Sequence, residues 1–199
     1  MKRFFDFTVS LLVILALLPV FLIIGIIIAI DAGNPVIYKQ YRVGKDNKLF
    51  YIYKFRTMKN NTRLAATKDL TEADSVITQS GRFLRKTSLD ELPQLFNVLK
   101  GDMSFVGPRP LIPEEKEIRQ IRKEYGIYSV RPGITGWAQV NGRDMLTDEE
   151  KALFDKEYVD KQSLIFDIKI MIKTVMVVLK RENIAEGGEP DNKYNSGNS

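Results

Sequence analysis

Residues 9–30 form a run of 22 residues without a charged side chain. A helix of that length matches the hydrocarbon thickness of a bilayer, so the run ties the chain to a membrane and limits what can follow it. The run is too long for the apolar region of a cleavable signal peptide, and no convincing small-x-small cleavage site follows it. Two forms remain open: a helix that crosses the bilayer once, and a helix that enters and returns to the same face.

Pro19 lies near the middle of this run, where it removes a backbone hydrogen bond and favours a bend. Lys2 and Arg3 precede the run, and further basic residues follow it at positions 39, 42, 45 and 48. A spanning helix is basic mainly at its cytoplasmic end, so two basic flanks favour the returning form. Proline is also tolerated in spanning helices, and the residues alone leave the two forms about even. In both forms the chain after Asp31 lies on one side of the membrane.

Neither cysteine nor histidine occurs among the 199 residues. Their absence excludes thiolate and imidazole zinc sites, cysteine nucleophiles and every catalytic triad that contains histidine. A metal ion must then be a hard ion bound by oxygen, for which Mg²⁺ is the first candidate. The 30 basic and 25 acidic side chains give a net charge of +5. That modest excess suits anionic lipids or phosphorylated substrates, and without a dense basic tract it predicts no nucleic-acid binding.

The pattern predicts an α+β fold that is mainly helical, organised as a membrane helix (residues 1–30), one domain (31–184) that forms a unit with it, and a flexible tail (185–199). Residues 36–38 and 49–55 are β-branched and aromatic, with a turn at 44–47 between them, so we expect a short hairpin. Residues 60–74 are polar and unpatterned, and predict a mobile loop. Residues 78–99 are helical in pieces, and the glycine- and proline-rich segments 105–113 and 130–142 predict loops.

Two further helices are expected near the carboxyl end of the domain. Thr147 with Glu150 is a capping signature that opens a helix to about Asp160. Residues 164–181 form an apolar helix with interspersed basic side chains. They suit an amphipathic helix at the membrane interface, and an ordinary core helix with one solvated face fits equally well.

Asp90 and Glu91 stand together at the predicted start of a helix. With Asp90 as the N-cap, Pro93 falls in the first turn, where its missing N–H does no harm, and Gly101 ends the helix. A cap at Ser88 would complete a capping box with Glu91 but would place the proline deeper, so we expect the first arrangement.

The two acids have a plain structural use and a chemical one. Acids in the first turn of a helix commonly cap it and complement its dipole. The same helix end also attracts phosphate, and a carboxylate there can attack phosphorus while its neighbour holds Mg²⁺. Asp90 and Glu91 are therefore candidates both for catalysis and as metal ligands.

Several basic side chains are candidates to bind phosphate. Arg109 lies in a Gly-Pro-Arg-Pro sequence that fixes its direction, as a bidentate clamp needs, although a solvated surface turn is the simpler interpretation. Arg56 follows the second predicted strand. Arg85 shares one helical face with Arg82 and Lys86, and such a face is usually solvated or near lipid headgroups.

The segment from Arg131 to Arg143 is punctuated by glycine and holds the only tryptophan of the chain. A nucleotide base could stack on Trp137 while Arg143 and Gln139 offer polar contacts, and Arg131 is a further candidate to bind substrate. The more frequent use of a lone tryptophan is to anchor the core or the membrane interface.

Three stretches, KFRTM (54–58), SLDELPQLFNVLKGDMSFVGPRP (88–110) and RPGITG (131–136), resemble the bacterial sugar transferase family. Its members are monotopic polyprenyl-phosphate phosphoglycosyl transferases, and the resemblance runs from Lys2 to about Arg181. The resemblance implies that the first helix is re-entrant, with its bend at Pro19. Many members have serine before this proline, where this chain has Leu18.

The resemblance also implies a two-step reaction at the cytoplasmic face of a bacterial cell membrane. Asp90 attacks the sugar-linked phosphorus of a UDP-sugar and expels UMP, with help from Glu91 through Mg²⁺. A polyprenol phosphate such as undecaprenyl phosphate then takes the phosphosugar from Asp90. Arg109 is implicated in phosphate binding, and the position of Arg56 is basic in relatives. Such chemistry starts exopolysaccharide and other glycan assembly.

Two alternatives stay open beside this reading. A lipid-phosphate phosphatase that forms an aspartyl phosphate would use the same residues but would turn over without an acceptor. A membrane-anchored binding protein, whose acids only cap helices, would release no UMP.

Overall fold

The computed structural model describes residues 2–59, 76–142 and 145–180. Within these ranges the chain is mainly helical with two small sheets, which confirms the predicted α+β class. The loop predicted at 60–74, the residue Arg143 and the tail predicted at 185–199 lie outside the described residues.

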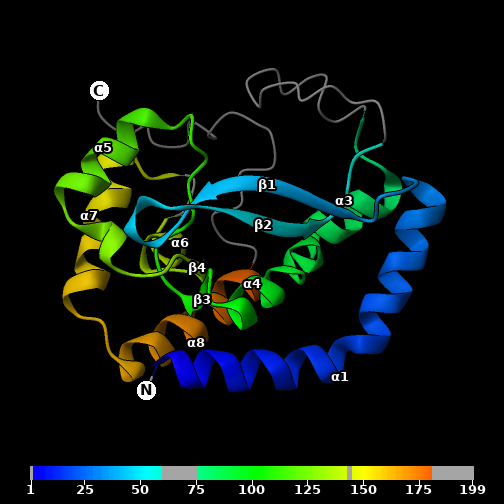
Figure 1. Ribbon diagram of the computed structural model, residues 1–199, viewed down its shortest axis with the longest axis horizontal. Helices are drawn as coiled ribbons and strands as arrows, with labels where there is room; N and C mark the ends of the chain where they lie inside the picture. Colours follow the sequence, from blue (N-terminus) through cyan, green and yellow to red (C-terminus); the bar gives the residue numbers. More distant parts are fainter. Residues whose placement is uncertain (1, 60–75, 143–144, 181–199) are drawn as a thin grey trace, which may run out of the picture.

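Helix α1 (Lys2–Asp31) contains the whole apolar run. It is long and apolar enough to cross a bilayer, as no other helix in the described ranges is. Figure 1 shows α1 running along the base of the molecule and then turning to rise along one side. Pro19 lies inside the helix and accounts for this bend, because proline removes one hydrogen bond of the helical ladder. Many apolar side chains of α1 stay uncovered, among them Leu12, Leu18, Leu22 and Ile26.

The predicted hairpin is confirmed. Strands β1 (Ile37–Val43) and β2 (Leu49–Phe55) pair antiparallel, with Ile37 opposite Phe55 and Val43 opposite Leu49. The connection contains η1 (Lys45–Asn47), in which Asp46 and Asn47 adopt positive φ. Aspartate and asparagine tolerate that conformation better than other residues with a Cβ, which explains the tight reversal.

The helical pieces after Thr78 are α3 (Gln79–Lys86), η2 (Leu89–Glu91) and α4 (Gln94–Lys100). The prediction that Asp90 is the N-cap of a helix is wrong. Ser88 has a left-handed φ of 56° that reverses the chain after α3, so Asp90 falls in the short turn η2 instead. Pro93 is the N-cap of α4, where it needs no N–H partner. Gly101, with φ of 97°, ends α4 as predicted.

The segments predicted as loops contain a short parallel pair, β3 (Ser104–Val106) and β4 (Gly133–Thr135). Its backbones approach so closely that a Cβ on Gly133 would lie 2.1 Å from the Gly107 nitrogen. Glycine is therefore required there, and the same glycines made the segment look like a loop. Between the strands lie α5 (Lys116–Glu124) and η3 (Ile127–Ser129), and α6 (Trp137–Val140) follows β4.

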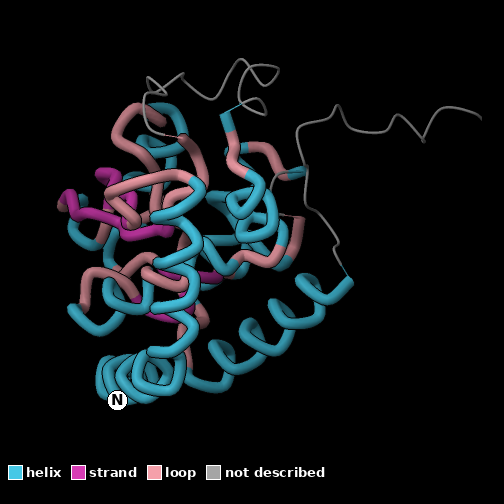
Figure 2. Tube along the Cα trace, turned by 90° about the vertical axis from the view of Figure 1, so that its right-hand side faces the viewer, coloured by secondary structure: helices cyan, strands magenta, loops and turns pink. Residues whose placement is uncertain are grey.

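Helices α7 (Asp148–Asp160) and α8 (Leu164–Lys180) end the described chain. The predicted capping box is present, with Thr147 and Glu150 exchanging hydrogen bonds. Figure 2 shows α8 extending from the base of the molecule, where the first part of α1 is seen end on. Ile165, Ile172 and Val175 of α8 are more than half exposed, so both helices leave apolar side chains uncovered at this base.

The second part of α1 packs into the core of the domain. Ile24 and Ile28 are buried with Phe55 of β2 and Leu84 of α3. A second cluster joins Val106 of β3 to Val140, Tyr158 and Ile170 of the last three helices. The apolar helix therefore shares a core with β2 and α3, and Leu89 and Leu92, which flank the Asp90–Glu91 pair, pack against it.

Candidate active site

A shallow hollow opens where β1, β2 and β4 meet the η2–α4 segment and the loop that follows β3. It is lined by residues from five separate segments, namely Arg42, Ile52, Lys54, Glu91, Gln94, Arg109, Pro110, Gly133 and Ile134. The structure thus brings together Glu91 of the predicted acidic pair and Arg109 of the predicted phosphate clamp. Three cations and one carboxylate line a small space, which suits an anionic ligand.

Glu91 reaches across the hollow to strand β2. The Lys54 Nζ lies 2.7 Å from Glu91 Oε1, and both side chains are about one-fifth exposed. Because this pair is partly open to water, its contribution to folding is small, and its charges remain accessible to a ligand.

Asp90 is half-buried beside this pair. Burial is the main cause that raises the pKa of Asp90, and the Glu91 carboxylate raises it further. Lys54 and Arg85 act in the opposite direction and lower the pKa. The two cations therefore help to keep Asp90 an anion in a place where burial disfavours the charge.

Arg109 lies in the arginine loop, which comprises residues 107–110 between β3 and α5. Gly107 N donates to Thr135 O at 2.9 Å, and Pro108 O accepts from Gly133 N at 3.0 Å. Pro110 O accepts from Arg42 Nη1 at 3.2 Å. The loop is thus held by backbone contacts along its length, and the predicted stiffness has a physical basis.

Arg85 and Arg56 lie at the edges of the acidic segment. Arg85 Nε donates to Thr57 Oγ1 at 2.9 Å, and its charge acts on Asp90. Arg56 follows β2 directly, is half-buried, and donates its backbone N–H to Val36 O at 2.9 Å. Neither of these arginines lines the hollow, although Arg85 is near enough to influence the nucleophile candidate.

Two other predicted binding residues have structural partners away from the hollow. Arg131 Nε donates to Gly101 O at 2.8 Å, where a cation complements the carboxyl end of α4. Trp137 Nε1 donates to Glu157 Oε2 at 2.7 Å, and its ring packs edge-on against Phe166 with centroids 5.0 Å apart. These contacts fit the anchoring role that is the more frequent use of a lone tryptophan.

Sequence reasoning missed Arg42 and Gln94 as residues of the hollow. Arg42 is half-buried, and burial together with the nearby Arg109 charge lowers its pKa. The hairpin pattern could have indicated Arg42, because side chains two positions apart on a strand lie on the same face of the sheet. The pairing of Gln40 with Ile52 places Arg42 and Lys54 on the same face of the sheet.

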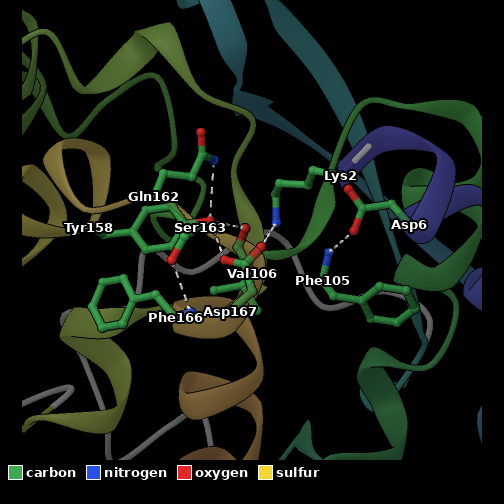
Figure 3. A network of polar contacts seen from close by, with 9 residues as sticks. All are labelled: Lys2, Asp6, Phe105, Val106, Tyr158, Gln162, Ser163, Phe166 and Asp167. Atoms are coloured by element: carbon green, nitrogen blue, oxygen red, sulfur yellow. Dashed lines mark hydrogen bonds and ion pairs between the residues drawn. The ribbon is translucent and has the colours of Figure 1, made fainter.

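A polar network connects the start of α1 to Val106, the residue just before the arginine loop (Figure 3). Lys2 Nζ lies 2.5 Å from Asp167 Oδ2, and Asp167 Oδ1 lies 2.8 Å from the Tyr158 hydroxyl. The same hydroxyl lies 2.9 Å from Val106 O, so its single proton serves one of two acceptors. Burial raises the pKa of Tyr158, which keeps the phenol protonated as a donor. The network therefore connects α1 to the residue just before the arginine loop.

A second contact joins α1 to α4. The guanidinium of Arg3 donates to Val98 O at 2.5 Å and to Leu99 O at 2.7 Å. These are carbonyls of the last turn of α4, where helical hydrogen bonding ends, and Val98 O also accepts from the backbone N–H of Gly101. At the opposite end of α1, Asp31 Oδ2 accepts from the Ser80 backbone N–H at 2.9 Å. Both ends of α1 are thus bonded to the same domain.

Comparison with known proteins finds relatives that match nearly the whole chain. The family model described as bacterial sugar transferase matches residues 1–181. The uncharacterized sugar transferase EpsL of Bacillus subtilis (strain 168) is 41% identical over 186 residues, which cover 94% of this chain and 91% of that protein.

Two longer relatives have more specific names. The undecaprenyl-phosphate glucose phosphotransferase of Komagataeibacter xylinus is 40% identical over 87% of this chain and 35% of its own length. The UDP-glucose:undecaprenyl-phosphate glucose-1-phosphate transferase of Escherichia coli (strain K12) is 42% identical over 88% of this chain and 39% of its own length. The chain therefore spans little more than a third of these two proteins.

Proposed function

This chain belongs to the bacterial sugar transferase family, and we propose that it transfers a phosphosugar from a UDP-sugar to a polyprenol phosphate, undecaprenyl phosphate, with release of UMP. The observation that supports this most directly is the hollow, where Glu91 lies with Lys54, Arg42 and Arg109. A cluster of cations around a carboxylate suits a diphosphate whose phosphorus is to be attacked. The names of the longer relatives support the same pair of substrates.

The proposed reaction has two displacements at one phosphorus atom. An oxygen of Asp90 forms a bond to the sugar-linked phosphorus, and the bond from that phosphorus to the bridging oxygen breaks as UMP leaves. A phosphate oxygen of the polyprenol phosphate then attacks the same phosphorus, and Asp90 is released as a carboxylate. Arg109, aimed by its stiff loop, binds phosphate oxygens, while Lys54 and Arg85 favour the anionic form of Asp90.

We propose Mg²⁺ as the metal, held by Asp90 and Glu91. No group of three or more acidic side chains in the described ranges forms a metal cluster. Two adjacent carboxylates still fit Mg²⁺, because this ion usually binds one or two carboxylates and completes its shell with water and substrate phosphate. When bound, the ion would neutralise phosphate charge and let a carboxylate approach an anionic substrate.

We propose that α1 is re-entrant and that the rest of the chain lies on the cytoplasmic face. Lys2 and Arg3 at one end of α1, and Asp31 at the other, all bond to the same domain. A helix whose two ends hold one domain has both ends on one side of the bilayer. The bend of α1 supports this topology, since the uncovered apolar side chains around it can lie in lipid.

The test is UMP release by the purified full chain in detergent or nanodiscs, with a panel of UDP-sugars. With undecaprenyl phosphate we expect continuous release and a polyprenyl-diphosphate-sugar product. Without acceptor we expect release to stop after about one equivalent per protein, because the phosphosugar stays on Asp90. Mass spectrometry of the stalled protein should place the added mass on the peptide that contains Asp90.

The alternatives predict different outcomes in the same assay. Continuous release without acceptor would favour a phosphatase, and no release with any UDP-sugar would favour a binding protein. An added mass on another peptide would overturn the role of Asp90. The matched control is Asp160→Asn, which changes an exposed aspartate of α7 outside the hollow. This variant should leave UMP release unchanged both with and without acceptor.

A further inference from the structure

Behind the arginine loop lies a buried ion pair that the proposed chemistry does not use. Arg122 of α5 and Asp155 of α7 are bonded through Nη2 and Oδ2, and they are 3% and 1% exposed. The other end of the guanidinium, Nη1, donates to the backbone oxygen of Arg109 at 2.7 Å. The pair therefore touches the phosphate-binding candidate through its main chain.

We infer that Arg122 and Asp155 are positioning residues for Arg109, an inference that rests on the proposed function. Fixing the Arg109 carbonyl fixes the peptide plane after its Cα, and hence the direction in which the side chain leaves the backbone. Asp155 in turn fixes the guanidinium of Arg122, because a buried arginine is held in one orientation by a bonded carboxylate.

The composition of the loop explains why an outside donor is needed. Pro108 and Pro110 have no N–H, so the loop is fastened chiefly through its carbonyl oxygens. Pro108 O is held by the Gly133 backbone and Pro110 O by the Arg42 side chain. Between them, Arg109 O is held by Arg122. Without the Arg122 contact, Pro108 O and Pro110 O would keep their hydrogen bonds, but the Arg109 carbonyl between them would lose the one from Arg122.

A purely structural role would not require an ion pair at this place. Replacing a buried ion pair with apolar side chains of similar volume is often neutral for folding or even stabilising. Apolar side chains, however, cannot donate to the Arg109 carbonyl. The two roles can therefore be separated, because one variant can keep the core filled and still remove the anchor.

The experiment compares the full-length double variant Arg122→Met/Asp155→Leu with the wild type for UMP release in the presence of undecaprenyl phosphate. We expect the variant to fold, with a Tm close to that of the wild type, and kcat/KM for the UDP-sugar to fall about tenfold to hundredfold. A displacement of about 1 Å in a binding group is enough for a loss of this size. The same apolar swap at the exposed pair Lys156–Asp160 of α7 is the matched control and should change neither value.

The decisive measurement is a double-mutant cycle with Arg109→Ala. If the ion pair acts by orienting Arg109, the apolar replacement of Arg122 and Asp155 should lower kcat/KM by less than about twofold in the Arg109→Ala background. The inference would be overturned if kcat/KM fell in the Arg109→Ala background by as much as it does in the wild type. Unchanged kcat/KM in a folded double variant would overturn it as well.

A second variant covers the case in which the double variant does not fold. Arg122→Lys keeps a cation for Asp155, but its single ammonium group cannot reproduce the two-sided geometry of a guanidinium. We expect reduced kcat/KM at near-normal Tm, again without effect in the Arg109→Ala background, and full activity would contradict the role. Failure of the proposed function is recognised separately, because the wild type itself would then release no UMP.

Discussion

Asp90 and Asp155 are two aspartates whose pKa is raised mainly by burial, yet their surroundings differ. Asp155 is almost completely enclosed, its pKa is raised to about 6, and it is bonded to Arg122. Asp90 is only half-buried beside the Lys54–Glu91 pair, and Lys54 and Arg85 act on it through their charges. The enclosed Asp155 carboxylate is bonded to Arg122, whereas the half-buried Asp90 carboxylate keeps part of its surface exposed, as the proposed nucleophile requires.

The sharpest contrast is expected from Asp90→Asn. If Asp90 is the nucleophile, the amide cannot form the phosphosugar ester, and transfer should fall more than about a thousandfold. The Tm should stay the same or rise slightly, because a neutral amide does not carry the cost of ionisation that burial imposes. UMP release and thermal unfolding check both parts, and activity within tenfold of wild type would refute the assignment.

For Asp155→Ala we expect a loss of folding stability, in contrast to the unchanged stability of Asp90→Asn. Removing this carboxylate leaves the Arg122 charge buried without its partner, which costs about 3–5 kcal/mol of folding free energy. Urea unfolding of this variant and of Asp90→Ala, measured side by side, tests the comparison. Equal losses in the two variants would show that burial does not separate the two carboxylates as described.

The pH dependence of transfer should report the raised pKa of Asp90. Since burial raises this pKa, the protonated and non-nucleophilic form persists to a higher pH than in an exposed aspartate. The value of kcat/KM should therefore fall as the pH drops through the raised pKa, by about tenfold for each further unit. A profile that stays flat to below the ordinary aspartate pKa would contradict this expectation.

The smallest effect is expected from Lys54→Gln. Lys54 lowers the pKa of Asp90, so its removal should move the acid limb of the pH profile toward higher pH. Folding should change by less than about 1 kcal/mol, because the Lys54–Glu91 pair is partly exposed. Comparing the pH profiles of variant and wild type gives the shift, and a move toward lower pH would reverse the sign of the argument.

Local signals in the sequence predicted much of this fold. The capping box at Thr147 and the left-handed glycine at Gly101 act through a few adjacent residues, so their pattern is readable without tertiary structure. The hairpin was found for the same reason, from side chains that suit strands and residues that suit the turn. In the site, Arg109 and Glu91 were each predicted as candidates from their own surroundings, and the structure places both in the lining of the hollow.

The rest depended on contacts between distant segments. The β3–β4 pair consists of short strands whose glycines also fit a loop, and only the close approach of their backbones distinguishes the two. The N-cap at Asp90 was wrong because Ser88 adopts a left-handed φ that no local rule indicated. Arg122 and Asp155 lie 33 positions apart, and no local sequence pattern around either residue predicts that the two are paired.

The double attachment of α1 has a consequence for how the protein sits on lipid. A helix joined to its domain at one end would let that domain swivel, so the height of the hollow above the bilayer would vary. Here Arg3 is hydrogen-bonded to α4 and Asp31 to α3, and the apolar core shared with the domain lies between these two contacts. In the proposed topology, the depth of α1 in the lipid would therefore set the height and tilt of the hollow, and a change in bilayer thickness would move α1 and the domain together.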